Sequence, residues 1–212
     1  MINRILLAVL VIGAGLAAPS ADAASISTIF ASNNSGSTGG AVYFDVTVAD
    51  NAIDNTGFTT NTATTNPFTW TVYLTTAGTS AFGNETNSGA WTSVATGSGT
   101  GLGTNLASVV ALNNPFTLLA NTTYGMAFVI GGAGHSYTNG TGGNQAYSNA
   151  DVALSLGTAT NVPFTGPAFS PRVWNGSITY DVDSIPGVPE PTSLLLLGGG
   201  LLGLAFVRRR KA

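Results

Sequence analysis

The central part of the chain alternates apolar and polar residues with a period of two, which is the pattern of β-strands that bury one face. In residues 41–48 (AVYFDVTV) every even-numbered residue is apolar. Residues 68–75 (FTWTVYLT) and 123–130 (TYGMAFVI) repeat this alternation. The pattern predicts three strands, and it places Trp70 and Phe128, which lie on the apolar faces, in the hydrophobic core.

Shorter apolar segments predict further strands at residues 91–95, 107–112, 152–156 and 178–182. Segments rich in glycine, asparagine, serine and threonine, such as TGSGTGLGTN at residues 96–105, separate the strands and predict turns. Between the two ends of the chain, no segment carries the 3.6-residue apolar spacing of an amphipathic helix. We therefore predict an all-β domain at residues 24–187, folded as an antiparallel β-sandwich of jelly-roll type.

The first 23 residues have the three parts of a secretory signal peptide. Arg4 provides a short positive start, residues 5–18 form an uninterrupted apolar stretch, and Ala21-Asp22-Ala23 fits the small-x-small cleavage pattern. We expect a signal helix that directs the chain to the Sec machinery, with signal peptidase cutting after Ala23 or Ala24. The alternative, a permanent N-terminal membrane anchor, would need a longer apolar run.

The other end of the chain combines two prolines, an apolar stretch and a cluster of cations. Residues 192–207 carry no charge, and as a helix they would be roughly 24 Å long, a little less than the usual bilayer core of ~30 Å. The cluster that follows consists of Arg208, Arg209, Arg210 and Lys211. Because cations stay on the cytoplasmic side, we predict a C-terminal transmembrane helix that leaves the domain outside the inner membrane.

The order of these parts resembles the PEP-CTERM sorting signal of Gram-negative bacteria. The resemblance covers only residues 188–212 and rests on Val188, Pro189, Glu190 and Pro191, the Leu/Gly-rich span and the terminal arginines. It implies that an exosortase, a multi-pass membrane protease or transpeptidase, recognises the Pro-Glu-Pro tripeptide and removes the tail. The cationic cluster would retain the precursor in the inner membrane until then. The resemblance also implies an association with exopolysaccharide and biofilms.

Charge is scarce between the two terminal signals. Only 7% of the 212 residues are charged, and Arg172 is the one cation between residues 24 and 187. A nucleic-acid backbone would find no cationic surface, so nucleic acid is excluded as a partner. We expect Arg172 to pair with an acid and fix the segment around Trp174; the alternative is contact with an anionic saccharide. The chain has no cysteine, so its stability must come from packing.

The domain offers little for catalysis. His135 is the only histidine, and no Gly-x-Ser-x-Gly elbow accompanies it. Asp181 and Asp183 would share one face of a strand and could serve a secreted hydrolase, although acids at a strand end are more often solvated. We predict that the protein is not an enzyme and needs no cofactor. Calcium is an alternative, with Asp50, Asp54, Asp181 and Asp183 as weak candidate ligands.

Residues 135–151 (HSYTNGTGGNQAYSNAD) contain side chains suited to glycan contact. Tyr137 and Tyr147 could stack on sugar rings, and amides could bond paired hydroxyls, the candidates being Asn144, Gln145 and Asn149. The alternative, which we favour, is a polar loop with Asx turns and no ligand.

These observations predict an exported structural or adhesive protein. It would be anchored in the inner membrane as a precursor, and would then lie at the cell surface or in the extracellular matrix, with extracellular polysaccharide as a further candidate partner. A carbohydrate-binding module is the alternative, and a secreted hydrolase is a weaker one.

Overall fold

The three segments of strict alternation form strands in the structure, a computed structural model that describes residues 23–183. They are β3 (Ala41–Val48), β5 (Pro67–Leu74) and β8 (Thr123–Gly131). In β5 every apolar even-numbered residue is buried. The three predicted strands are confirmed, with boundaries that differ by no more than one residue.

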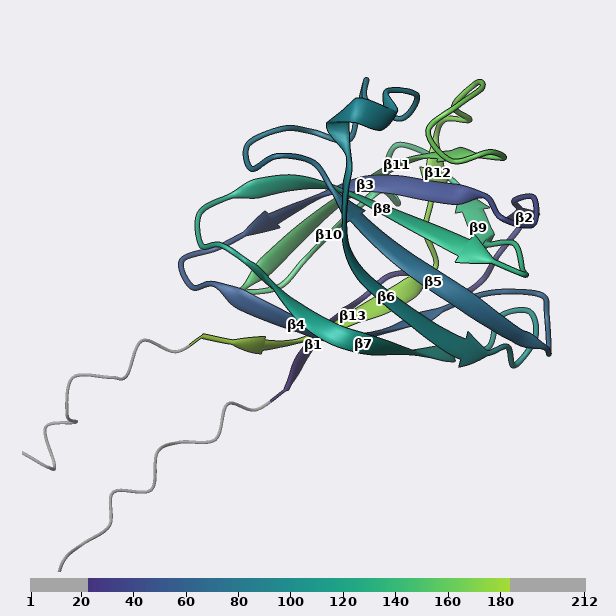
Figure 1. The fold of residues 1–212 in the computed structure, drawn as a ribbon, viewed down its shortest axis with the longest axis horizontal. Coiled ribbons are helices and arrows are strands. Elements are labelled where there is room, and N and C mark those ends of the chain that lie inside the picture. The colour runs from purple at the N-terminus through teal and green to yellow at the C-terminus, as the bar shows by residue number, and fades with distance from the viewer. Residues whose placement is uncertain (1–22, 184–212) are drawn as a thin grey trace, which may run out of the picture.

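Ten strands form one antiparallel sheet in the order β1-β13-β4-β7-β6-β5-β8-β3-β11-β10 (Figure 1). Its other members are β1 (Ala24–Ser27), β4 (Ile53–Thr60), β6 (Thr92–Thr100), β7 (Ser108–Leu118), β10 (Ala146–Ser148), β11 (Val152–Thr160) and β13 (Gly176–Val182). A small sheet contains β12 (Arg172–Val173), β9 (Ser136–Asn139) and β2 (Asn34–Ser35). One short 3-10 helix, η1 (Ser88–Ala90), lies between β5 and β6.

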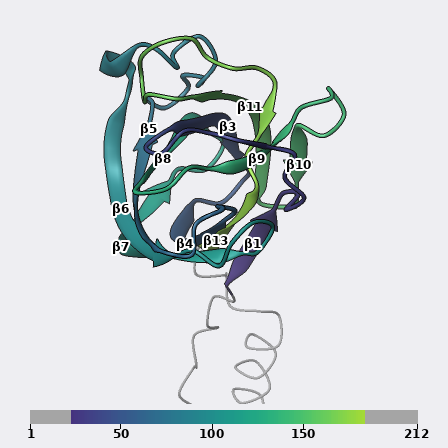
Figure 2. The same ribbon diagram turned by 90° about the vertical axis from the view of Figure 1, so that its right-hand side faces the viewer.

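The ten-stranded sheet curls so that its two halves face each other across a single core (Figure 2). Its edge strands, β1 and β10, approach each other at a seam. There the Asn149 side-chain amide donates to the Ser25 carbonyl oxygen at 3.3 Å and to the Tyr180 hydroxyl at 2.7 Å. The predicted all-β antiparallel sandwich is confirmed, and one sheet supplies both of its layers.

Phe128 on β8 lies at the centre of the core. Its ring centroid is 4.8 Å from those of Phe58 and Trp174, 4.9 Å from Trp70 and 5.2 Å from Phe44. All five side chains are buried, as predicted for Trp70 and Phe128. Aromatic pairs of this kind add about 0.5–1.5 kcal/mol each beyond the burial of their surface.

One strand lies in a segment for which no strand was predicted, and another extends beyond its predicted end into residues that were predicted to form a turn. β4 runs through IDNTGFTT, which has few apolar residues, and β6 runs through the glycine-rich TGSGT. On β6, a Cβ at Gly99 would collide with the Val109 carbonyl oxygen, and a Cβ at Gly97 would lie 2.5 Å from the Ala111 carbonyl oxygen. Glycine here permits the close approach of β6 and β7, so the prediction of a turn throughout residues 96–105 is wrong.

The chain enters and leaves the domain at the same end. β1 and β13 pair antiparallel, with Ala24 opposite Tyr180, so the first and last described strands lie side by side (Figure 1). The predicted signal helix and C-terminal transmembrane helix lie outside the described residues. Within residues 23–183 no helix is long and apolar enough to cross a membrane.

Candidate functional site

Tyr137, one of the two tyrosines expected to stack on a sugar, is buried. It lies on β9 with 4% of its surface exposed and belongs to the hydrophobic core. Tyr147 on β10 is half-buried, pairs with Leu154 and packs against the same core. Because stacking requires an open ring face, the buried Tyr137 does not suit the candidate role in glycan contact, which was the less favoured of the two interpretations of this segment.

The amides proposed for glycan contact hold the loop together instead. Asn144 accepts the Thr141 N–H at 2.8 Å, and Gln145 donates to the Leu156 carbonyl oxygen at 3.0 Å. The Asn149 side-chain oxygen accepts the N–H of Val152 at 2.9 Å, while its nitrogen closes the seam between β1 and β10. These contacts match the alternative of a polar loop with Asx turns.

Arg172 is held by aromatic rings and a carbonyl group. Its guanidinium lies 5.6 Å from the ring centroid of Tyr137 and 5.9 Å from that of Phe169. One of its nitrogens donates to the Pro171 carbonyl oxygen at 2.8 Å. The cation does fix the segment before Trp174, but through cation–π contacts rather than the acid that we expected.

Two candidate acids face each other across neighbouring strands. Asp181 on β13 is the register partner of Asp54 on β4, and the Thr117 hydroxyl donates to Asp54. Asp183 follows β13 and Asp50 lies in the turn between β3 and β4, both exposed. Within residues 23–183 no three histidine or acidic side chains gather in a way that could hold a metal ion. The sequence missed the pairing of Asp54 with Asp181 because it depends on strand register.

His135 is a core residue and not part of an exposed loop. Its ring lies 5.3 Å from that of Trp70, and its Nε2–H donates to the Phe128 carbonyl oxygen at 3.1 Å. Its Nδ1 has no partner among the described residues. Burial lowers the pKa of the imidazole to about 4, so it is neutral at pH 7.

The outward side of β3 and β8 is covered by the loops at residues 75–91 and 161–170 (Figures 1 and 2). Tyr43 packs there against Trp91, with ring centroids 5.5 Å apart, and against Phe164 at 5.9 Å. The Tyr43 hydroxyl shares a hydrogen bond with the Thr160 hydroxyl and accepts the Phe164 N–H, both at 2.9 Å. We call this region, centred on Tyr43, the covered face.

Carboxylates on the covered face are also used internally. Asp45 accepts hydrogen bonds from the Ser80 hydroxyl at 2.7 Å and the Ala81 N–H at 2.6 Å. Glu85 accepts the Gly83 N–H at 2.8 Å and the Thr158 hydroxyl at 3.1 Å. These acids fasten the loop at residues 75–91 to the sheet.

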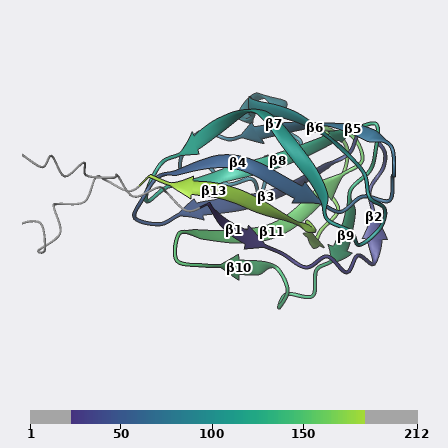
Figure 3. The same cartoon turned by 90° about the horizontal axis from the view of Figure 1, so that it is seen from below.

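Beyond the covered face, the outer surface of the sheet continues from β8 and β5 across β6, β7, β4, β13 and β1 (Figure 3). Strand register places one row of outward residues across seven strands: Gly131, Thr69, Ser98, Ala111, Gly57, Thr179 and Ser25. Beside this row lie Pro67, Thr100, Val109, Thr59, Ser177 and Ser27. All are exposed or half-buried, and none is charged. We call these two rows the hydroxyl face.

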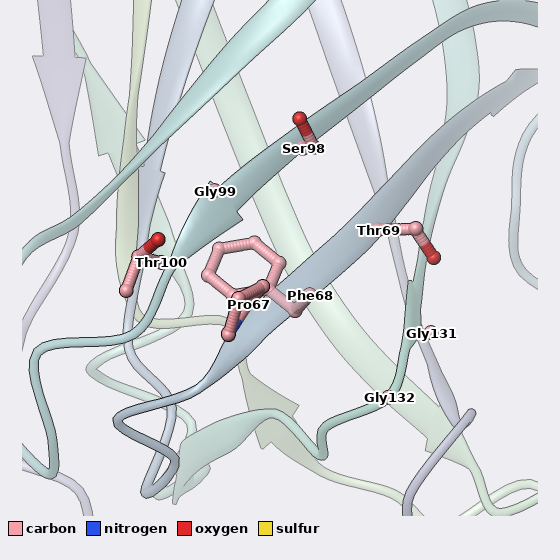
Figure 4. A pocket seen from close by; sticks show the side chains of 8 residues that line it. All are labelled: Pro67, Phe68, Thr69, Ser98, Gly99, Thr100, Gly131 and Gly132. Carbon is pink, nitrogen blue, oxygen red and sulfur yellow. The ribbon is translucent and has the colours of Figure 1, made fainter.

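A shallow hollow of about 570 Å³ lies at one end of the hydroxyl face (Figure 4). Its lining comprises Pro67, Phe68, Thr69, Ser98, Gly99, Thr100, Gly131 and Gly132. It is formed where β5 begins and β6 and β8 end, which is the end of the domain opposite the two chain ends. No local sequence pattern indicates the hollow, because it forms only where the ends of β5, β6 and β8 come together in the folded sheet.

The comparison with known families concerns the tail. The family model described as the PEP-CTERM protein-sorting motif matches residues 187–211. No curated protein matches the chain. The predicted motif is confirmed, and its residues, from Val188 to Pro191 and from Arg208 to Lys211, fall in the matched range but outside the described residues. The chain therefore carries a PEP-CTERM signal and is an exported protein, anchored at the membrane before an exosortase processes it.

Proposed function

We propose that the domain is a non-catalytic structural or adhesive component of the cell surface or extracellular matrix, associated with exopolysaccharide. The observation that carries the proposal is the sorting motif at residues 187–211, which directly follows the domain. In this account the Sec machinery and signal peptidase act at the N-terminus, and the exosortase acts around Glu190. After both processing steps, the β-domain is the part of the chain that would remain outside the cell.

The arrangement of the chain ends supports this proposal. Because β1 and β13 lie side by side, a precursor held by its tail is tethered at one end only. The end with the hollow thus lies opposite the end of the domain that leads to the tether.

The roles of the former catalytic candidates support a non-catalytic function. His135, the only histidine, is buried in the core and cannot reach a substrate. Asp181 and Asp54 face each other on neighbouring strands, so they remain the acids to test. The residues that line the hollow include no acid and no histidine, the usual groups for acid–base catalysis. If the domain were a hydrolase after all, Asp181→Asn would abolish its turnover.

The test uses the full chain in an exosortase-bearing host from which its gene has been deleted. We expect the wild type to reach the surface or matrix fraction and to restore cohesion of the biofilm. Glu190→Ala should remain in the inner membrane and fail to restore cohesion. Asp183→Ala, an exposed acid outside the motif, is the matched control and should behave as wild type. Unchanged cohesion after gene deletion would contradict the structural role.

A further inference from the structure

We propose that the hydroxyl face, with the hollow at its end, is a docking surface for an uncharged polysaccharide. This inference rests on the proposed function, because it requires the domain to lie outside the cell. It moves the glycan contact away from Tyr137 and its loop, to the outer surface of the sheet that runs from β8 to β1.

The first argument is charge complementarity. β5, β6 and β7 contain no ionisable side chain other than Tyr73, which packs in the covered face. Arg172, the one cation among residues 23–183, lies on β12 in the small sheet and is occupied by aromatic rings. An anionic polysaccharide would find no cation on the hydroxyl face, and a cationic partner would find no carboxylate. A neutral partner with many hydroxyl groups can bind without desolvating a charge.

The second argument is that hydroxyl groups are available there. Thr69, Ser98 and Thr100 are exposed, and among the described residues no hydrogen bond engages their hydroxyls, whereas the hydroxyls of Thr59 and Ser177 on the same face bond to each other at 2.6 Å. Thr69 and Ser98 are direct register partners, so their strands place them about 4.8 Å apart. Each hydroxyl can donate one hydrogen bond and accept two, which suits the hydroxyls of a sugar.

The third argument is the shape of the surface. Gly131 lies opposite Thr69 and presents no side chain, which leaves the hollow open beside the hydroxyls. Pro67 and Val109, the latter 62% exposed, add apolar surface for the C–H groups of a sugar ring. A polymer could follow the rows across neighbouring strands, since no bulky or charged outward side chain interrupts them.

The test measures binding of the exported, processed protein to polysaccharides by affinity gel electrophoresis. The neutral probes are dextran, laminarin and hydroxyethyl cellulose, and the anionic probe is alginate. We expect at least one neutral glucan to retard the wild type more strongly than alginate does. Ser98→Arg and Thr69→Arg should each weaken that binding at least about tenfold, because a long charged side chain would fill the hollow. Ser148→Arg, at an exposed position on β10, is the matched control and should bind as wild type.

Three results would overturn the inference. They are binding to none of the three glucans, stronger binding to alginate, and equal weakening by Ser148→Arg. Self-association in sedimentation that Ser98→Arg abolishes, without glucan binding, would instead identify the face as an interface between two copies. Circular dichroism checks that the variants are folded. If only the polysaccharide inference is wrong, the protein will still be sorted and will still restore biofilm cohesion. If the proposed function is wrong, the localisation and cohesion assays will show it.

Discussion

The covered face and the hydroxyl face are two regions of the outer surface of one curled sheet that adjoin along β5 and β8, and they use their polar groups differently. On the covered face, the Tyr43 hydroxyl and the Asp45 carboxylate are bonded to the loops that lie over them. On the hydroxyl face, Thr69 and Ser98 are exposed and make no such bonds within the described domain. The difference suggests that bonded polar groups maintain the fold, while the free ones are left for a partner.

Truncating the core that both faces share should have the largest effect. Phe128 contacts four aromatic rings, so Phe128→Ala should lower the free energy of unfolding by about 3–5 kcal/mol. Thr69→Ala, on the exposed hydroxyl face, should change it by no more than about 0.5 kcal/mol. Urea unfolding followed by tryptophan fluorescence measures both. Equal losses would remove the distinction between core and hydroxyl face.

Acid should weaken the shared core through His135. Its pKa is about 4 in the folded protein and near 6.5 when unfolded, so the unfolded state binds the proton first as pH falls. The stability that His135 contributes is therefore complete above pH 6.5 and declines between pH 6.5 and 4, by on the order of 3 kcal/mol. Measuring the free energy of unfolding of the wild type and of His135→Gln at pH 7.5 and 4.5 isolates the pH-dependent contribution of His135. An identical pH dependence in both would contradict the buried neutral histidine.

Removing one bonded hydroxyl from the covered face should have an intermediate effect. Tyr43→Phe leaves the Phe164 N–H and the Thr160 hydroxyl without their partner, so we expect a loss of about 1–2 kcal/mol. Hydrogen exchange should also accelerate at residues 161–170. Ser98→Ala, which removes a free hydroxyl, is the matched change on the other face and should be close to neutral. A cost of similar size for Ser98→Ala would show that its hydroxyl is not free.

The smallest expected effect concerns Arg172, which lies outside both faces. Trypsin has one site within residues 24–183, the bond after Arg172, and this residue is paired in β12 and stacked on Tyr137. Because a protease needs locally mobile backbone, the native protein should resist cleavage there for as long as it stays folded. Rapid cleavage of the native protein would show that the small sheet opens. Arg172 would then become available to an anionic partner.

Local patterns were sufficient to predict the long strands but not the faces. The alternation in residues 41–48, 68–75 and 123–130 reports burial directly, so β3, β5 and β8 were predictable. The hydroxyl face depends on register between strands distant in the chain, as between Ser25 and Thr179, which no local pattern contains. The sequence offered Tyr137 as a candidate for glycan contact because its neighbours are polar, whereas the fold places it in the core cluster with the Arg172 guanidinium over its ring.

The sorting motif, unlike the hydroxyl face, could be predicted from local sequence alone. It was predictable from sequence because a processing enzyme reads it as a short linear segment, so the order of Pro-Glu-Pro, apolar stretch and cations is sufficient. The candidate site on the domain requires a folded sheet to exist. This is why export and processing by an exosortase could be predicted from the tail, whereas the candidate partner surface required the structure.

The most direct test of the account is mass spectrometry of the protein recovered from the cell surface or medium. We predict an N-terminus at Ala24 or Ser25 and a C-terminus that lacks the residues from Arg208 to Lys211. The domain from β1 to β13 should be intact between these ends. A surface protein that retains the whole tail, or that reaches the surface unchanged when Pro189 and Pro191 are both replaced by alanine, would contradict processing by an exosortase.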